Sequence, residues 1–498
     1  MDSWWLKIAV MVGVVCAMVA FLAWRHQEQA TRPRRQARLE MAAAKEAYRA
    51  EAQGAPSRGL SDRVPIRDVL TLTQEPTTHR RQLDDRPVAK GGAPNVVLVI
   101  ACTLRRDQLS PYGGPVGLTP FVSQLAGQGS LFEDVVGASS WTKASMTAIL
   151  TGRHPVSIGL VEPKDSRNHR VLSPLVTTLA EQFTASGYYT LGVTGNPNLN
   201  TEFGLAQGFD QYTDTKWIAT NKRPAKELAI DALKLLDART ADEAELPFFL
   251  QLIVVDGHEP RRATRAERER HQSGDVSKEM ALYRVMVEHF DSGLQHLDQE
   301  LNNRGFDSTN TIFILTADHG EGLMEPRHHG NGHGRVLFPS LVAIPWIVRG
   351  PGVAKNHRIA GLVSHTDIVP TIAGLLELEA DPALSGFDWS GQLAGEPAAM
   401  GRQRAWSDTW FLNVERSAIW TPSQTCHKDY RGMGGVRCFD RLQDPTLAQG
   451  IELPALESEL DAWRAARLEE YKGWSDIVDA DVDETTAAQL EALGYVDN

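Results

Sequence analysis

The sequence lacks two features that point to particular classes of protein: a surplus of basic residues and an internal repeat. It carries 51 Lys and Arg against 63 Asp and Glu, a formal net charge of −12. Binding to nucleic acid requires clustered Lys and Arg, so this balance argues against nucleic acid as a partner. No repeat of about 20–50 residues is visible, which argues against solenoids and propellers. The composition, 42% hydrophobic and 23% charged over 498 residues, is that of an ordinary globular protein.

Cysteine is scarce, with four residues in the chain: Cys16, Cys102, Cys426 and Cys438. Cys426 and Cys438 bracket a turn-rich stretch and are predicted to close a small disulfide loop. A zinc pair is the weaker alternative, because the spacing does not suit a zinc knuckle and only His427 lies nearby. A disulfide would indicate an oxidising compartment outside the plasma membrane.

The amino terminus holds one long apolar run. Residues 8–24 carry no charge, and tryptophans flank the run at both ends. This length spans a bilayer and Trp suits both interfaces, so residues 4–24 are predicted to form a single transmembrane anchor. A cleaved signal peptide is the alternative, but residues 20–24 do not make a convincing small-residue cleavage site. Taken alone, the arginines that follow the run favour a cytoplasmic main domain.

Residues 25–92 are polar. Their first part is rich in Ala, Arg, Glu and Gln, which is typical of a solvated helix or stalk. Their second part has scattered Pro, Gly, Asp and Arg, which is a linker composition. We therefore predict a polar stalk and linker over residues 25–92. A catalytic-type domain is expected over residues 93–380, and a smaller C-terminal subdomain over residues 381–498.

Buried strands alternate with helices from Asn95 onwards. Apolar runs that begin at Asn95, Leu246 and Thr311 each read as a buried strand, and a long helix is predicted over Lys278–Asn303. Alternation of this kind predicts an α/β fold with a mostly parallel sheet sandwiched by helices.

Polar residues follow each of the three predicted strands directly. Because the carboxyl ends of parallel strands meet at one edge of a sheet, we expect these side chains to form one site. The oxygen of Asp318 and the nitrogen of His319 are suited to one metal ion. The residues at the three strand ends are Cys102 and Thr103, Asp256 and His258, and Asp318 and His319.

A glycine-rich loop after the third strand is rich in histidine. His319, His328, His329 and His333 all fall within it, and the glycines would let the loop fold over a site. A polar surface loop is the alternative interpretation. Four of the chain's 15 histidines in so short a segment favour a functional loop.

Several segments occur in the order found in a known family. They are NVVLVIACTLRRDQLSPYG, TPFVSQLAGQGSLFEDV, WTKASMTAILTGRHPVSIGL, LAEQFTASGYYTLGVTGN, PFFLQLIVVDGHEP, TADHGEG, GHGRVLFPSLVAIPWIVRGPG, VSHTDIVPTIAGLLEL and the tail TTAAQLEALGYVDN. Together they resemble the sulfatase branch of the alkaline-phosphatase superfamily. This resemblance implies a sulfatase-like α/β domain that hydrolyses, or in some members transfers, a sulfate or phosphate ester with the help of a divalent metal ion.

The nucleophile motif departs from the family pattern. Sulfatases make formylglycine from the first residue of Cys/Ser–x–Pro–x–Arg, and the resemblance places that position at Thr142. The motif here reads Thr142–Lys143–Ala144–Ser145–Met146. No formylglycine is therefore expected, and Thr142 would act as a direct nucleophile, as in related phosphoethanolamine transferases.

The metal ligands implied by the resemblance are also altered. Cys102 stands where the family carries an Asp, which leaves Asp318 and His319 as recognisable ligands. We assign Asp318, His319 and Cys102 as candidate ligands of a divalent ion, either zinc or calcium. A thiolate suits zinc better than calcium.

The positions that would act on the leaving group and on the charged oxygens are better preserved. We assign His258, His333 and Arg335 as catalytic residues beside Thr142. We assign two residues to substrate binding: Arg153 of the intact LTGR motif, and Asn196. The resemblance also implies that a Lys–x–His usually carried by the family is replaced here by Gly195, Asn196 and Asn198.

Two functions stay open. One is a membrane-anchored enzyme acting on a small-molecule, glycan or lipid ester. The other is a catalytically degenerate binding or scaffolding protein, because each lost group contributes about 10²–10³-fold to such a reaction. The family usually works outside the cytoplasm, so the resemblance favours an extracytoplasmic main domain, against the arginines. The oligomeric state is left open.

Overall fold

The computed structural model describes residues 77–80 and 87–490 apart from short stretches. These stretches are residues 161–169, 216–221, 326–330, 380, 382–383, 398–400, 412–413, 433–434, 473–479, 481, 483–485 and 487–489. The described residues belong to one compact unit, Pro65–Asn498. The predicted anchor, residues 4–24, and most of the predicted stalk lie outside the described residues. Among the helices described, none is long and apolar enough to cross a membrane.

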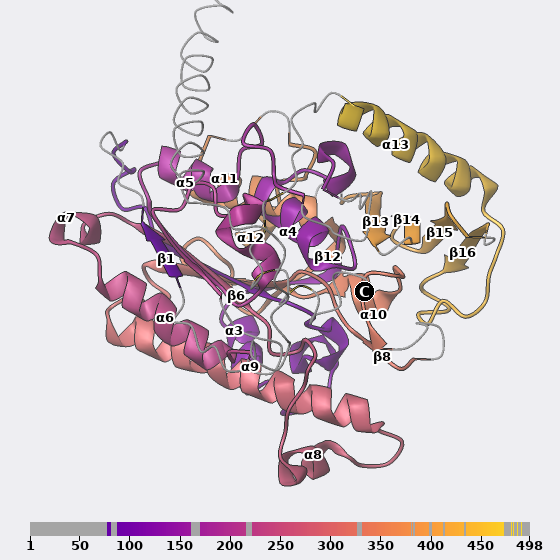
Figure 1. Ribbon diagram of the computed structural model, residues 1–498, viewed down its shortest axis with the longest axis horizontal. Helices are drawn as coiled ribbons and strands as arrows, with labels where there is room; N and C mark the ends of the chain where they lie inside the picture. Colours follow the sequence, from indigo (N-terminus) through magenta and orange to yellow (C-terminus); the bar gives the residue numbers. More distant parts are fainter. Residues whose placement is uncertain are drawn as a thin grey trace, which may run out of the picture. The chain divides into compact units, whose positions relative to one another are not determined.

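A large mixed sheet forms the centre of this unit (Figure 1). Its strand order is β1-β5-β4-β6-β2-β7-β11-β3-β10, and β12 pairs with β3. The bounds are β1 Thr77–Arg80, β2 Asn95–Ala101, β3 Ser130–Val136, β4 Tyr189–Thr194, β5 Gln211–Asp214, β6 Phe248–Val254, β7 Thr311–Ala317, β10 Ala343–Ile344, β11 Trp346–Arg349 and β12 His357–Ser364. The run from β5 through β4, β6 and β2 to β7 is parallel, as is the β3–β12 pair, whereas β1, β10 and β11 pair antiparallel. The predicted α/β fold with a central sheet is confirmed. The sheet is mixed: its central run is parallel as predicted, and the antiparallel pairs lie outside that run.

The three central strands are buried on both faces because helices cover both. Nearly every residue of β2, β6 and β7 is buried, which explains their continuous apolar sequences. Figure 1 shows α3, α6 and α9 on one face and α4, α5, α11 and α12 on the other. Their bounds are α3 Pro120–Gly127, α4 Thr142–Thr151, α5 Leu179–Ala185, α6 Ala225–Asp237, α9 Lys278–Asn303, α11 Ile368–Leu376 and α12 Ser390–Leu393. The prediction of a helix over Lys278–Asn303 is confirmed.

A second, smaller sheet forms the C-terminal subdomain. It has the order β13-β14-β15-β16 and is antiparallel throughout. The long helix α13 packs against it, and Arg464 of this helix donates to Asp408 at 3.2 Å. The bounds are β13 Ala405–Phe411, β14 Val414–Trp420, β15 Gln424–Asp429, β16 Val436–Asp440 and α13 Pro454–Lys472. The remaining short elements are α7 Ala241–Ala244, α8 Arg265–His271, α10 Pro339–Val342, β8 Gly322–Leu323 and β9 Asn331–Gly332.

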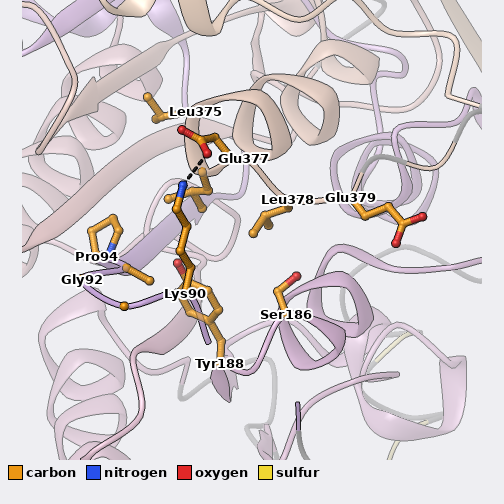
Figure 2. Close-up of a pocket in the computed structure, with 12 residues that line it drawn as sticks. Lys90, Gly92, Pro94, Ser186, Tyr188, Leu375, Glu377, Leu378 and Glu379 are labelled. Atoms are coloured by element: carbon orange, nitrogen blue, oxygen red, sulfur yellow. Dashed lines mark hydrogen bonds and ion pairs between the residues drawn. The ribbon is translucent and has the colours of Figure 1, made fainter. Parts of the chain in front are cut away.

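A pocket of about 350 Å³ lies where the chain enters β2 and β4 (Figure 2). The ion pair of Lys90 and Glu377 crosses it, and Tyr188 lines it. Because these residues lie at the amino ends of the strands, the pocket is at the opposite edge of the sheet from the predicted site. None of the predicted site residues lines it.

The predicted disulfide is present in the second sheet. Cys426 of β15 and Cys438 of β16 lie directly opposite each other in the ladder and are bonded. The alternative prediction, that these two cysteines bind zinc, is therefore wrong. Both cysteines are buried, in a cluster that includes Leu456 and Leu460 of α13.

We expect the disulfide to stabilise the subdomain by restricting its unfolded state. For a separation of 12 residues, chain-entropy arguments give roughly 3 kcal/mol. Urea unfolding of the C426S/C438S variant should therefore show a correspondingly lower free energy of unfolding, and dithiothreitol should affect the wild type but not the variant. The C102S variant, which keeps the disulfide, is the control. An unfolding midpoint of the wild type that does not respond to dithiothreitol would contradict this expectation.

Candidate functional site

Three central strands bring their following residues to one edge of the sheet. Ala101 at the end of β2 pairs in register with Val254 of β6 and with Ala317 of β7. The residues after these strands therefore start at the same level, which is the convergence that the sequence predicts. At this edge, backbone and side-chain groups form hydrogen bonds with one another.

Asp318 joins the ends of β2 and β7. Its Oδ1 accepts from the backbone N–H of Thr103 at 3.0 Å and from that of His319 at 2.6 Å. Thr103 has a φ of 61°, in the left-handed region that costs a β-branched residue energy. Asp318 is fully buried, and none of the described residues supplies a hydrogen bond to its Oδ2.

The imidazole of His319 has a defined orientation. Its Nδ1 lies 2.8 Å from the carbonyl oxygen of Gly320, which can only accept, so Nδ1 carries the proton and Nε2 presents a lone pair. Nε2 lies 3.4 Å from Oγ1 of Thr142 and 3.4 Å from Oδ2 of Asp318. Burial lowers the pKa of His319, against the opposing effect of Asp318, so the ring is neutral at pH 7.

Thr142 is the first residue of α4, and Asn196 contacts it from the loop after β4. Nδ2 of Asn196 lies 3.4 Å from Oγ1 of Thr142 and 3.5 Å from Sγ of Cys102. Oδ1 of Asn196 accepts from the backbone N–H of Asn198 at 3.0 Å, so the amide turns its N–H groups towards the cluster. The structure thus brings Thr142, Asn196, Cys102, Asp318 and His319 together.

Cys102 is a free, buried cysteine. Burial, and then the charge of Asp318, raises the pKa of its thiol well above the ordinary value. The prediction of a thiolate ligand therefore depends on a cation that would offset both effects.

His258 and His333 lie beside His319. The ring centroid of His333 is 4.3 Å from that of His319 and 5.1 Å from that of His258. Burial, together with the proximity of His333, lowers the pKa of His258 to about 3. His258 is therefore neutral at physiological pH and acts as a hydrogen-bonding group.

A buried ion pair holds His333, and the sequence did not single it out. Oε1 of Glu321 lies 3.1 Å from Nδ1 of His333, and its Oε2 accepts from Arg261 at 2.7 Å. Burial alone would raise the pKa of Glu321, but His333 and Arg261 lower it to about 2. Glu321 belongs to the TADHGEG segment, but Arg261 is 60 residues away, and sequence spacing gives no signal for their contact.

Arg153 and Arg335 differ in their surroundings. Arg153 follows the carboxyl end of α4, whose 10 residues place it about 15 Å from Thr142. Its Nη2 pairs with Asp381 at 2.9 Å. Arg335 is exposed. The guanidinium of Arg153 is therefore bound by a carboxylate outside the cluster, and the catalytic assignment of Arg335 stays a prediction.

The residues that follow Thr142 in α4 are buried. Met146 is fully buried in the main hydrophobic core and supplies no charge. Lys143 is also buried, and its Nζ lies 4.0 Å from the ring centroid of Phe203. His328 and His329 lie outside the described residues.

A family comparison agrees with this architecture. The family model described as Sulfatase matches residues 94–378, more than half of the chain. The chain belongs to the sulfatase family. Its membership supports a sulfate-ester-hydrolase type of function, and the family generally uses a divalent metal ion, often calcium.

Individual sulfatases are distant in sequence. The ulvan-active sulfatase of Formosa agariphila is 22% identical over 419 residues, which cover 74% of this chain and 80% of that protein. Human arylsulfatase A is 27% identical over 360 residues, 61% of this chain and 68% of that protein. The solved structure of a 2-O GAG sulfatase matches with a TM-score of 0.63 at 16% identity and covers 79% of this chain and 96% of that one. The structural match shows that the fold is shared.

The types of donor atom at the site determine which cation suits it. Oδ2 of Asp318 and Nε2 of His319 are two acceptor atoms side by side, with no donor from the described residues on Oδ2, and such a pair suits a cation. Calcium takes about six to eight oxygen ligands, whereas zinc takes sulfur, nitrogen and oxygen. The sulfur of Cys102 and the inward N–H of Asn196 therefore fit calcium poorly. Within the described part of the chain, no group of three or more His, Cys, Asp and Glu side chains is arranged to hold a metal ion.

We expect the Arg261–Glu321 pair to be essential for the order of this site. Both side chains are almost fully buried, so removal of one partner leaves a buried charge and costs about 3–5 kcal/mol. Urea unfolding of R261M and E321Q should show such losses.

The R261M/E321Q double variant provides the control. Because it removes both charges, it should lose clearly less than the sum of the single losses. Additive losses would show that the two side chains do not interact.

Proposed function

We propose that this sulfatase-family protein hydrolyses or transfers a sulfate or phosphate ester with Thr142 as the direct nucleophile. The observation that carries the proposal is the position of the Thr142 hydroxyl. It lies between the lone pair of His319 Nε2 and the N–H groups of Asn196, at the edge where three strands end. Nε2 of His319 is also a proposed ligand of the cation, so the hydroxyl lies beside the cation's place, and metal coordination would activate it.

The proposed reaction has two halves. In the first, Oγ1 of Thr142 forms a bond to the sulfur or phosphorus atom, the bond to the ester oxygen breaks, and the hydroxyl proton leaves to water. The departing oxygen takes a proton from His333, whose ring Glu321 orients at 3.1 Å. In the second half, water or an acceptor hydroxyl forms a bond to the sulfur or phosphorus atom and gives its proton to His333. The bond to Oγ1 of Thr142 then breaks, and Oγ1 takes up a proton from water. The N–H groups of Asn196 stabilise the charged oxygens in both halves.

A divalent ion, when bound, would neutralise the charge of the transferring group and lower the pKa of the nucleophile. We propose zinc in this role, with Asp318 and His319 as ligands. Cys102 would complete a set of three only after its side chain moved, because the described side chains do not group three such donors around one point. The support for zinc is the donor set of oxygen, nitrogen and sulfur. Formylglycine plays no part in the proposal, since Thr142 cannot be converted to it.

We propose a single membrane anchor at residues 4–24 and an extracytoplasmic main domain. The uncharged run with its flanking tryptophans supports the anchor. The Cys426–Cys438 disulfide supports an oxidising compartment. The arginines after the run oppose this orientation, but a large following domain translocates largely regardless of such charges.

An ester of a small molecule, a glycan or a lipid would be the substrate in that compartment, and nucleic acid would not.

A second candidate function is a catalytically silent binding or scaffolding protein. Two observations favour it: Thr142 is fully buried, and Met146 leaves the site without the family's arginine charge. The two functions differ in whether Thr142 ever forms a covalent bond.

The kinetics of Thr142 variants separate these functions. On a panel of aryl sulfates, phosphate monoesters and phosphodiesters, T142A should lower kcat/KM by at least about 10³-fold, because the nucleophilic atom is gone. T142S keeps the hydroxyl and should retain measurable turnover. Wild-type protein that turns over no ester on the panel would favour the silent function.

Metal analysis tests the proposed ligands. Wild-type protein purified without chelator should contain stoichiometric zinc, and C102S should lose most of it, because serine oxygen is a poorer zinc ligand than thiolate sulfur. The C426S/C438S variant should keep its zinc and controls for general loss of structure. Calcium in place of zinc, or the same zinc content in C102S, would contradict the proposed donor set.

A further inference from the structure

His365 is fully buried and bonded through both ring nitrogens. Its Nδ1 accepts from the backbone N–H of Ala138 at 3.0 Å, and its Nε2 donates to the carbonyl oxygen of Ala317 at 3.0 Å. An amide N–H can only donate and a carbonyl can only accept. The ring is therefore neutral, with its proton on Nε2.

These two backbone groups belong to the two segments that carry the candidate site. Ala138 lies in the segment between β3 and α4, and this segment ends at Thr142. Ala317 is the last residue of β7 and directly precedes Asp318 and His319. One imidazole ring thus links the segment that ends at Thr142 to β7, the strand that leads into Asp318 and His319.

The register of the sheet explains how His365 reaches both segments. β12 runs parallel to β3, and Ser364 at its end pairs with Val136 at the end of β3. The next residues, His365 and Gly137, are therefore level. A Cβ on Gly137 would lie 3.2 Å from Cε1 of His365, which is closer than ordinary contact. Glycine at this position lets the ring approach the Ala138 N–H.

Asp367 anchors the turn that carries His365. This buried carboxylate accepts from the backbone N–H groups of Ser364 at 3.0 Å and Phe387 at 2.8 Å, and from Nε of Arg402 at 3.0 Å. The turn that carries His365 is therefore fixed.

The segment with Ala138 is anchored on the opposite side by the second sheet. The carbonyl oxygen of Ala138 accepts from the N–H of Asp408 at 2.9 Å, and that of Gly137 accepts from the hydroxyl of Ser407 at 2.6 Å. The two bonds of His365 connect this anchored segment to the end of β7 through one side chain.

We propose that His365 is a positioning residue that holds Thr142 at its distance from Asp318 and His319 by bonding Ala138 and Ala317. The catalytic consequence rests on the proposed function of Thr142, whereas the link between the two segments does not. Phenylalanine at this position would fill the space without either bond, and glutamine would offer both a donor and an acceptor.

The test uses the full-length protein in detergent and compares H365F, H365Q and H427F with the wild type. His427 is the matched control, since its ring packs against Trp420 and Phe439 of the second sheet. Hydrogen–deuterium exchange followed by mass spectrometry reports the amides of residues 138–142 and 318–320. In H365F both groups of amides should exchange at least about tenfold faster than in the wild type. H365Q should restore most of the protection, and H427F should leave both segments unchanged.

Turnover gives the second readout for any ester that the wild type accepts. H365F should lower kcat by about 10- to 100-fold with KM nearly unchanged, because displacement of the nucleophile affects the chemical step. H365Q should recover part of kcat. Unchanged exchange in H365F would overturn the link, and faster exchange with unchanged kcat would overturn the positioning role. Wild type without turnover would count against the proposed function, while the exchange data would still decide the link.

Discussion

One carboxylate oxygen, Oδ1 of Asp318, joins the ends of two central strands, and the candidate site depends on this junction. It binds the backbone N–H of Thr103 after β2 and that of His319 after β7. Both bonds are buried, where hydrogen bonds to a charged group are strong and unpaired groups are costly. The junction holds Thr103 at a positive φ and leaves Oδ2 facing His319. Loss of Asp318 would release both strand ends and the atoms that they carry.

Cys102 is the residue whose meaning changes most between sequence and structure. In the sequence it is an unexpected residue at the end of a buried strand. In the structure its sulfur lies 3.5 Å from the amide of Asn196, and burial, followed by the charge of Asp318, raises the pKa of its thiol. Asn196 and Met146 carry no charge. These side chains are compatible with the proposed softer cation and with the proposed direct use of Thr142.

The sequence was sufficient for the strands and for most of the residues at their ends. Apolar runs with polar residues directly after them are local signals, and parallel register brings Cys102, Asp318 and His319 to one edge without further information. The bounds of α9 also follow from local pattern, with Ser277 as the residue that caps its start. The order of motifs placed Thr142 and Asn196 at the same site.

Other features depend on contacts that no local pattern encodes. The LTGR motif predicts Arg153 at the site, but α4 carries it away from Thr142 and Asp381 binds it. Arg335 is exposed although it is two residues from His333. The pair of Arg261 and Glu321 depends on the folding of two separate loops onto each other.

The central claim is that Thr142 forms a covalent bond to the transferred group. Its most direct test is mass spectrometry of the protein after brief incubation with an activated aryl sulfate or phosphate ester and an acid quench. We expect a mass increase of one sulfo or phospho group on the peptide that contains Thr142, and no such increase in T142A. An ester that is consumed with no adduct on Thr142, or with the adduct on another residue such as Cys102, would contradict it.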